Sequence, residues 1–244
     1  MADTATTQAA PTGGKSLIAR LFGVLTSPRS TYPDIVARPR VLGALAVVVL
    51  ISAGAVFAFM STDVGQQATL DMQIRQMESF GRTMTDAQYE RMEQMAGLTK
   101  YFGAAGQVVS LPLMALVVAG LAFAVFNAGM GGDATFKQAY SVVVHSGVII
   151  AVQQLFVLPL DYLRQTLTSP TNLAVFLPFL DENSFAARML GSIDLFVIWW
   201  ILNVSIGFAV LYRKRTGPVA TTLLIIYVLI GFVIAAVKSA LSGA

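Results

Sequence analysis

The sequence of 244 residues has no cysteine, a single histidine and only 12% charged residues. Without cysteine, the chain cannot form disulfides, thiolate metal sites or a thiol nucleophile. A soluble domain carries about twice this share of charged residues. Here 56% of the residues are hydrophobic and the mean hydropathy is +0.70. Because so few charges cannot cover so much apolar surface in water, we expect the chain to lie in a lipid bilayer.

Five apolar stretches reach the length of roughly 20 residues that a helix needs to cross a bilayer. Long apolar runs favour helices over barrel strands, in which apolar and polar residues alternate. We therefore predict an all-α integral membrane protein, a bundle of five transmembrane helices with a short interfacial amphipathic helix at the N-terminus. The predicted spans cover residues 41–60, 101–126, 139–160, 193–212 and 219–237.

The net charge of +3 needs no nucleic-acid partner, because membrane proteins gather Lys and Arg in their cytoplasmic loops. With the N-terminus on side one, nine basic and three acidic residues fall on that side, against seven basic and ten acidic residues on the other. This imbalance predicts a bacterial inner-membrane protein with a cytoplasmic N-terminus and a periplasmic C-terminus. The residues that set this topology are Arg38, Arg40, Arg213, Lys214 and Arg215.

The first 40 residues divide into two parts before the membrane domain of residues 41–241. Residues 1–15 are small and polar and predict a disordered cytoplasmic tail. Residues 16–40 form a cytoplasmic lead-in that contains "SLIARLFGVLTSP". One helical face there carries the apolar residues, with Arg20 off it, as in a helix that lies in the membrane interface. We favour an anchor that orients the first span over a docking element. The apolar face consists of Leu17, Ile18, Leu21, Phe22 and Leu25.

The sequence lacks the residue sets of most enzymes. One histidine, no phosphate-binding loop and no paired carboxylates on one membrane helix face argue against catalysis. We therefore expect no enzyme activity, no cofactor and no metal. Thr85 with Gln88, and Thr135 with Gln138, have the spacing of capping boxes at helix starts. The Met-rich loop of residues 61–100 is expected to pack amphipathic helices onto the membrane surface rather than to bind a soft metal.

Polar residues recur within the predicted spans, where such residues usually face the bundle interior. On the third span, Ser141, His145 and Gln153 follow one helical face. Hydrogen bonding between helices explains these residues most simply. A solvated pathway that runs past His145 and faces the second span is the alternative. The predicted polar face comprises Gln107, Ser110, Ser141, His145, Gln153, Asp194, Asn203 and Ser205.

Three stretches together resemble the Yip1-domain family in its short prokaryotic five-span form. They are "SPRSTYPDIVARPRV" before the first span, "GGDATFKQAYSVVVHSG" entering the third and "GSIDLFVIWWILNVSIGFAV" in the fourth. The resemblance extends from about Leu21 to Val237. It implies five spans and a cytoplasmic N-terminus, in agreement with the hydropathy and the charge distribution.

The resemblance also implies a function class. Eukaryotic members associate with Rab GTPases, organise membranes and form hetero-oligomers. Their Asp-Leu-Tyr-Gly-Pro motif is missing here, and their Gly-Tyr pair falls at Val144 and His145, so a Rab-type GTPase is not expected. We expect a non-enzymatic adaptor or organiser that associates with membrane-protein partners or with itself. The alternative is a transporter or channel for a small solute, an ion or a lipid.

Overall fold

The computed structural model describes residues 14–78, 81–129, 131–181 and 184–242, and the structural statements below concern these residues. Of the predicted tail, residues 1–13 lie outside this part of the chain. The described residues form helices and connecting turns, with one isolated antiparallel bridge between Asn172 and Asp194. The all-α architecture predicted from hydropathy is therefore confirmed.

Four stretches are long and apolar enough to cross a membrane. They are α3 (Leu42–Met60), α6 (Ala96–Phe123) with the π-helical turn Ala124–Gly129, the pair α7 (Phe136–Ser146) and α8 (Val148–Arg164), and α11 (Thr216–Ser242). A fifth apolar helix, α10 (Leu195–Leu211), has 17 residues and a length of about 25 Å at 1.5 Å per residue. That length lies at the lower end of what spans a bilayer.

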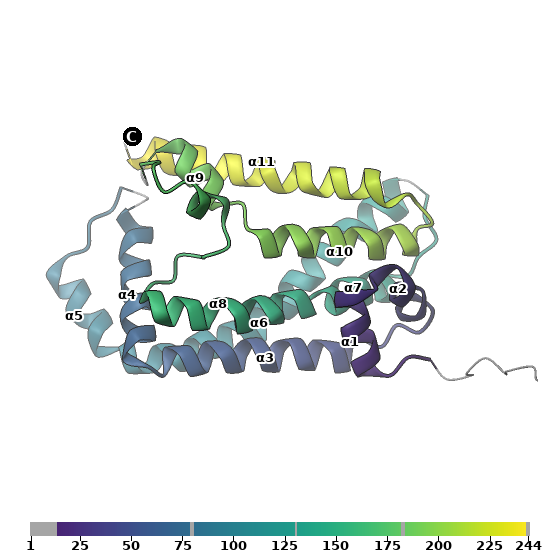
Figure 1. Ribbon diagram of the computed structural model, residues 1–244, viewed down its shortest axis with the longest axis horizontal. Coiled ribbons are helices and arrows are strands. Elements are labelled where there is room, and N and C mark those ends of the chain that lie inside the picture. Colours follow the sequence, from purple (N-terminus) through teal and green to yellow (C-terminus); the bar gives the residue numbers. More distant parts are fainter. Residues whose placement is uncertain (1–13, 79–80, 130, 182–183, 243–244) are drawn as a thin grey trace, which may run out of the picture.

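The remaining helices lie near the two ends of this bundle. At one end, here called the inner end, α1 (Leu17–Thr26) and α2 (Pro28–Ala37) form a hairpin against α7 and α10 (Figure 1). At the other, outer end, α4 (Asp63–Glu78) lies across the bundle axis (Figure 1). The short helices at the outer end are α5 (Asp86–Gln94), α9 (Phe185–Gly191) and the 3₁₀ turn Leu173–Phe176.

Both predicted capping boxes are present. The Gln88 side chain accepts a hydrogen bond from the backbone N–H of Thr85 at 3.0 Å, where α5 begins. The Gln138 side chain accepts one from Thr135 N–H at 2.8 Å, and the Thr135 hydroxyl accepts from Gln138 N–H at 3.3 Å. The Gln138 amide also donates to the carbonyl of Val36 at 3.2 Å, which ties the start of α7 to the end of α2.

The third span is the centre of the bundle. In its most apolar 18-residue window, 56% of the residues are buried, compared with 28% in α3, 22% in α11 and 6% in α6. The main hydrophobic cluster accordingly joins valines of α7 and α8 to residues of α1, α2, α3, α6 and α10. Ser141, His145 and Ser146 of the third span therefore lie inside the protein, whereas α6 packs one side against α3 and α7 and leaves the other side exposed.

Candidate functional site

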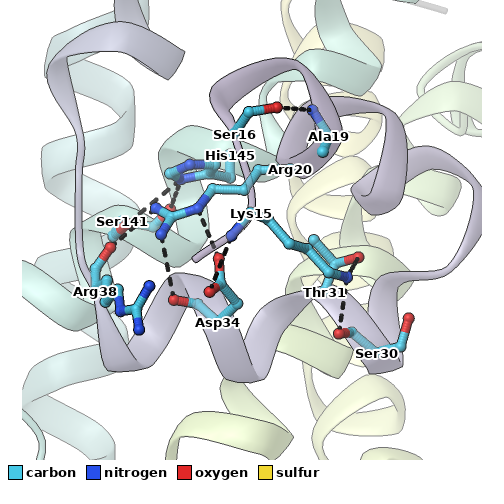
Figure 2. A network of polar contacts seen from close by, with 10 residues as sticks. All are labelled: Lys15, Ser16, Ala19, Arg20, Ser30, Thr31, Asp34, Arg38, Ser141 and His145. Carbon is cyan, nitrogen blue, oxygen red and sulfur yellow. Dashed lines mark hydrogen bonds and ion pairs between the residues drawn. The ribbon is translucent and has the colours of Figure 1, made fainter. Parts of the chain in front are cut away.

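An arginine holds the N-terminal hairpin together at the inner end. Arg20 of α1 is 2% exposed. Its Nε donates to a carboxylate oxygen of Asp34 in α2 at 2.8 Å, and its Nη1 donates to the carbonyl of Arg38 at 2.9 Å (Figure 2). The Nζ of Lys15 donates to the Ser30 carbonyl and the Thr31 hydroxyl, both at 3.0 Å. These bonds join the first half of α1, and the residue before its N-cap, to both ends of α2.

The structure shows what lies on the two sides of α1. Arg20 lies off the exposed apolar side, and it is buried together with Leu21 and Val24 against the rest of the chain, whereas Ile18 and Phe22 are 68% and 66% exposed. The reason is the partner set of Arg20, because a buried guanidinium is tolerated when charge-assisted hydrogen bonds replace its hydration. The acceptors lie in α2, so a helical pattern within α1 cannot reveal them.

The single histidine lies beside this hairpin. His145 is fully buried in α7, and its Nδ1 lies 2.8 Å from the carbonyl oxygen of Ser141, one turn earlier. Donation to that carbonyl makes Nδ1 the protonated nitrogen and leaves Nε2 as an acceptor. Nε2 is buried and has no hydrogen-bond partner among the described residues. The imidazole interacts electrostatically with Arg20 and Asp34, next to which Figure 2 shows it.

A second connection joins the hairpin to α10. The Tyr32 hydroxyl donates to the side-chain oxygen of Asn203 at 2.5 Å, and the Asn203 amide donates to the carbonyl of Val24 at 2.8 Å. Burial raises the pKa of Tyr32 well above its usual value, so the phenol keeps the proton that it donates. Gly207 makes room for this contact, because an added Cβ would lie 2.4 Å from Val142 and 2.9 Å from the Tyr32 ring.

Asp194 organises a separate cluster at the start of α10. One carboxylate oxygen accepts from the backbone N–H of Phe196 at 2.8 Å and from the Gln153 amide at 3.2 Å. The other accepts from the hydroxyls of Ser169 at 2.6 Å and Thr171 at 2.7 Å. Asp194 therefore caps α10 and at the same time fastens α8 and the 169–172 segment to it.

Tyr227 extends this cluster to the last span. Its hydroxyl accepts from the backbone N–H of Asp194 at 2.9 Å and donates to the carbonyl of Ser192 at 2.8 Å. The Asp194 cluster thus connects the third, fourth and fifth spans at the level where α10 begins, which is near the middle of the third and fifth spans.

The predicted polar face is divided among separate places. Ser141 and His145 lie beside the hairpin, and Gln153 joins Asp194 at the start of α10. Asn203 faces the hairpin, and the buried Ser205 donates to the carbonyl of Ile201 in its own helix at 2.7 Å. One continuous stripe would need the third span to be a single straight helix, whereas α7 ends and α8 begins at Gly147.

The second span does not complete this face. Gln107 is half-buried, and Ser110 is exposed on the surface of α6. Ser141, by contrast, is fully buried. Within this chain Ser110 therefore does not face Ser141, since it lies on the exposed side of α6.

The topology residues are exposed at one end. Arg38 and Arg40 follow α2, and Arg213, Lys214 and Arg215 form the turn between α10 and α11. Figure 1 shows this turn at the same end of the bundle as α1 and α2. Five alternating spans require the segment before the first span and the turn between the fourth and fifth spans to lie at the same end. The C-terminal end of α11 lies at the opposite end (Figure 1).

Three of these residues carry no clear signal in the sequence. Arg20, Tyr32 and Asp34 lie in the predicted cytoplasmic lead-in before the first span, yet they form the contacts of the hairpin. Asp161, near the end of α8, is 2% exposed, and its Oδ1 has no partner among the described residues. The described residues contain no group of three or more His, Asp or Glu side chains placed to hold a metal ion.

Comparison with known proteins assigns the family. The model of the Yip1 domain matches residues 22–237. The chain belongs to the Yip1-domain family. It is also 28% identical over 228 residues to a Bacillus subtilis protein named membrane protein YknW, covering 91% of this chain and 89% of the relative. No solved structure matches the chain. The family match includes the hairpin from Phe22 onward, so α2, which packs against α7 and α10, is part of the Yip1 domain.

Proposed function

We propose that this Yip1-family chain is a non-enzymatic membrane adaptor or organiser, which associates through α6 with a partner membrane protein or with a second copy of itself. The observation that carries the proposal is the surface position of α6, of which 6% of the most apolar window is buried. In the corresponding window of every other long span, a larger share of the residues is buried. The exposed side of α6 is therefore available to another helix.

The residues on that side suit close helix contact. Gly106 and Ser110 are four residues apart on one face and both are exposed. An added Cβ at Gly106 would meet nothing within 4 Å. Pairs of small residues at this spacing let membrane helices approach closely, and van der Waals packing then drives their association. Gln107, half-buried beside them, offers an amide that can hydrogen-bond across such a contact.

Single-cysteine crosslinking tests the proposal, because the natural chain has no cysteine. Ser110→Cys places a thiol on the proposed face, and Val108→Cys, 51% exposed, places one about 160° away on the same helix. In native membranes, oxidation or a short photoactivatable crosslinker on Ser110→Cys should give one dominant dimer or heterodimer, and Val108→Cys should give much less. Equal or absent crosslinking at both positions would refute α6 as the contact.

The same proposal places the protein in the bacterial inner membrane, with the inner end in the cytoplasm. The excess of basic residues on that side supports this orientation. A cysteine at Lys214 should be labelled by an impermeant thiol reagent only after the cytoplasm is opened. Labelling from the periplasm of intact cells would reverse the topology. We propose neither a cofactor nor a Rab-type GTPase as a ligand.

A transporter for a small solute, an ion or a lipid is the second candidate, supported by one observation. His145 Nε2 is buried without a partner, and a polar atom of this kind is commonly satisfied by water in a hydrated interior. Cysteines at Ser141, His145 and Gln153 test this candidate. Labelling at His145 by an impermeant reagent, together with saturable flux in proteoliposomes, would favour transport. A silent His145 position beside a labelled Lys214 position would favour the adaptor.

A further inference from the structure

We propose that the N-terminal hairpin binds anionic phospholipid at the inner end of the bundle, with Ile18 and Phe22 among the acyl chains and neighbouring cations at the headgroups. The inference goes beyond the adaptor role and does not depend on it. It starts from the two large apolar side chains of α1 that the rest of the chain leaves exposed, by 68% and 66%.

The position of α1 places these side chains at the membrane boundary. Figure 1 shows α1 crossing the direction of the long spans at the inner end. Leu17 of α1 packs at the first turn of α3, where an added Cβ on Gly43 would lie 3.0 Å from the Leu17 side chain. Leu42, next to that contact, is 82% exposed at the start of an apolar span. The exposed apolar surface of α3 therefore begins at the level of α1.

The hairpin cannot turn these side chains inward. Rotation of α1 would break the bonds of Arg20 to Asp34 and to the Arg38 carbonyl. It would also separate Gly23 from Thr31, which are so close that an added Cβ on Gly23 would lie 2.3 Å from the Thr31 hydroxyl. Whatever covers Ile18 and Phe22 must therefore come from outside the hairpin.

The charge around the hairpin selects the ligand. Near the start of α1, the Arg38 guanidinium lies against the backbone, since an added Cβ on Gly14 would be 2.1 Å from its Nη1. Of the acids described at this end, Asp34 is paired with Arg20 and Asp133 is exposed. A membrane leaflet with anionic headgroups complements such a site, because its acyl chains can surround the apolar side chains and its headgroups can bind the cations. The exposed cations of the inner end are Arg29, Arg38, Arg40, Lys137, Arg213, Lys214 and Arg215.

Fluorescence in nanodiscs tests the apolar half of the proposal. Phe22→Cys is labelled with an environment-sensitive fluorophore, and Ser30→Cys, exposed at the start of α2, is the matched control. In nanodiscs of phosphatidylcholine with phosphatidylglycerol, emission from the Phe22 position should shift to the blue and be quenched by lipid-bound nitroxide. The control should be quenched by aqueous iodide instead. Ile18→Cys repeats the measurement at a second position.

Lipid selectivity tests the charged half. Energy transfer to labelled phosphatidylglycerol, compared with labelled phosphatidylcholine, should show enrichment of the anionic lipid around the chain. Arg38→Gln with Arg40→Gln should reduce this preference roughly thirtyfold, since each surface cation near an anionic leaflet contributes about one kcal/mol. Quenching of Phe22 by iodide would overturn the proposal and leave the face to a protein partner. Lipid quenching without preference for phosphatidylglycerol would overturn it as well.

Discussion

The second and third spans differ more in burial than in composition. Both cross the predicted membrane, and α6 has the higher mean hydropathy, 2.5 against 1.9 for α7 and α8. Yet 6% of the α6 window and 56% of the third span are buried. The less apolar third span lies at the centre because its polar groups find hydrogen-bond partners only in other parts of the protein. Apolar side chains, by contrast, can contact lipid without a cost in free energy. Hydropathy therefore identifies spans but not their place in the bundle.

The largest effect is expected at Arg20, whose polar contacts join α1 to α2 at the inner end. Arg20→Ala leaves Asp34 without its charged partner and the Arg38 carbonyl without a donor. We expect a loss of about 3 kcal/mol in the free energy of unfolding in detergent, the upper range for hydrogen bonds to charged groups. Arg29→Ala, on an exposed position of α2, should change it by less than about 0.5 kcal/mol. Equal effects would mean that the hairpin adds no stability.

A pair of glycine substitutions contrasts the inside with the surface directly. Gly207→Ala forces Tyr32 and Val142 apart and should cost about 2 kcal/mol, as overpacking of a core does. Gly106→Ala has open space and should leave monomer stability within about 0.5 kcal/mol. Gly106→Ile should weaken the association seen with Ser110→Cys, while Gly207→Ala should leave it intact in whatever protein folds. Destabilisation of the monomer by Gly106→Ala would contradict the exposed position of α6.

The Asp194 cluster extends the comparison to the start of α10. Thr171→Val keeps the shape of the side chain but removes the hydroxyl that donates to Asp194 at 2.7 Å. The expected cost is about 1.5 kcal/mol, because the carboxylate keeps its bonds from Ser169 and Gln153. Thr168→Val, on an exposed position, is the control. Denaturation of both variants measures the difference, and a cost as large as that of Arg20→Ala would mean that the Asp194 cluster stabilises the bundle as much as the hairpin does.

The smallest effect is expected at the histidine. His145→Leu removes one hydrogen bond to the Ser141 carbonyl and a buried nitrogen without a partner. Removal of the buried Nε2, which has no partner among the described residues, stabilises the fold, and removal of the hydrogen bond destabilises it. Because the two effects oppose each other, the free energy of unfolding should change by less than about 1 kcal/mol. Crosslinking through Ser110→Cys should persist. Complete loss of association or of flux in a folded His145→Leu variant would give His145 a functional role in place of a structural one.

Some features of the molecule are local enough to be predicted from sequence. The apolar runs depend on transfer of side chains into lipid, and the structure places helices on them with ends shifted by a few residues. The capping boxes at Thr85 and Thr135 need only a partner three residues away, so their spacing predicted them correctly. The family resemblance was carried by contiguous stretches and is confirmed by the match over residues 22–237.

The composition and order of side chains thus determined that this chain enters a membrane, that it is helical and where its spans lie, because these properties depend on residues within one or two turns. Only the tertiary structure decided which faces are inside. Arg20 is buried because Asp34 and the Arg38 carbonyl lie opposite, and Tyr32 meets Asn203 across 171 positions of the chain. Such partners come from other helices, so no periodicity within one helix contains them.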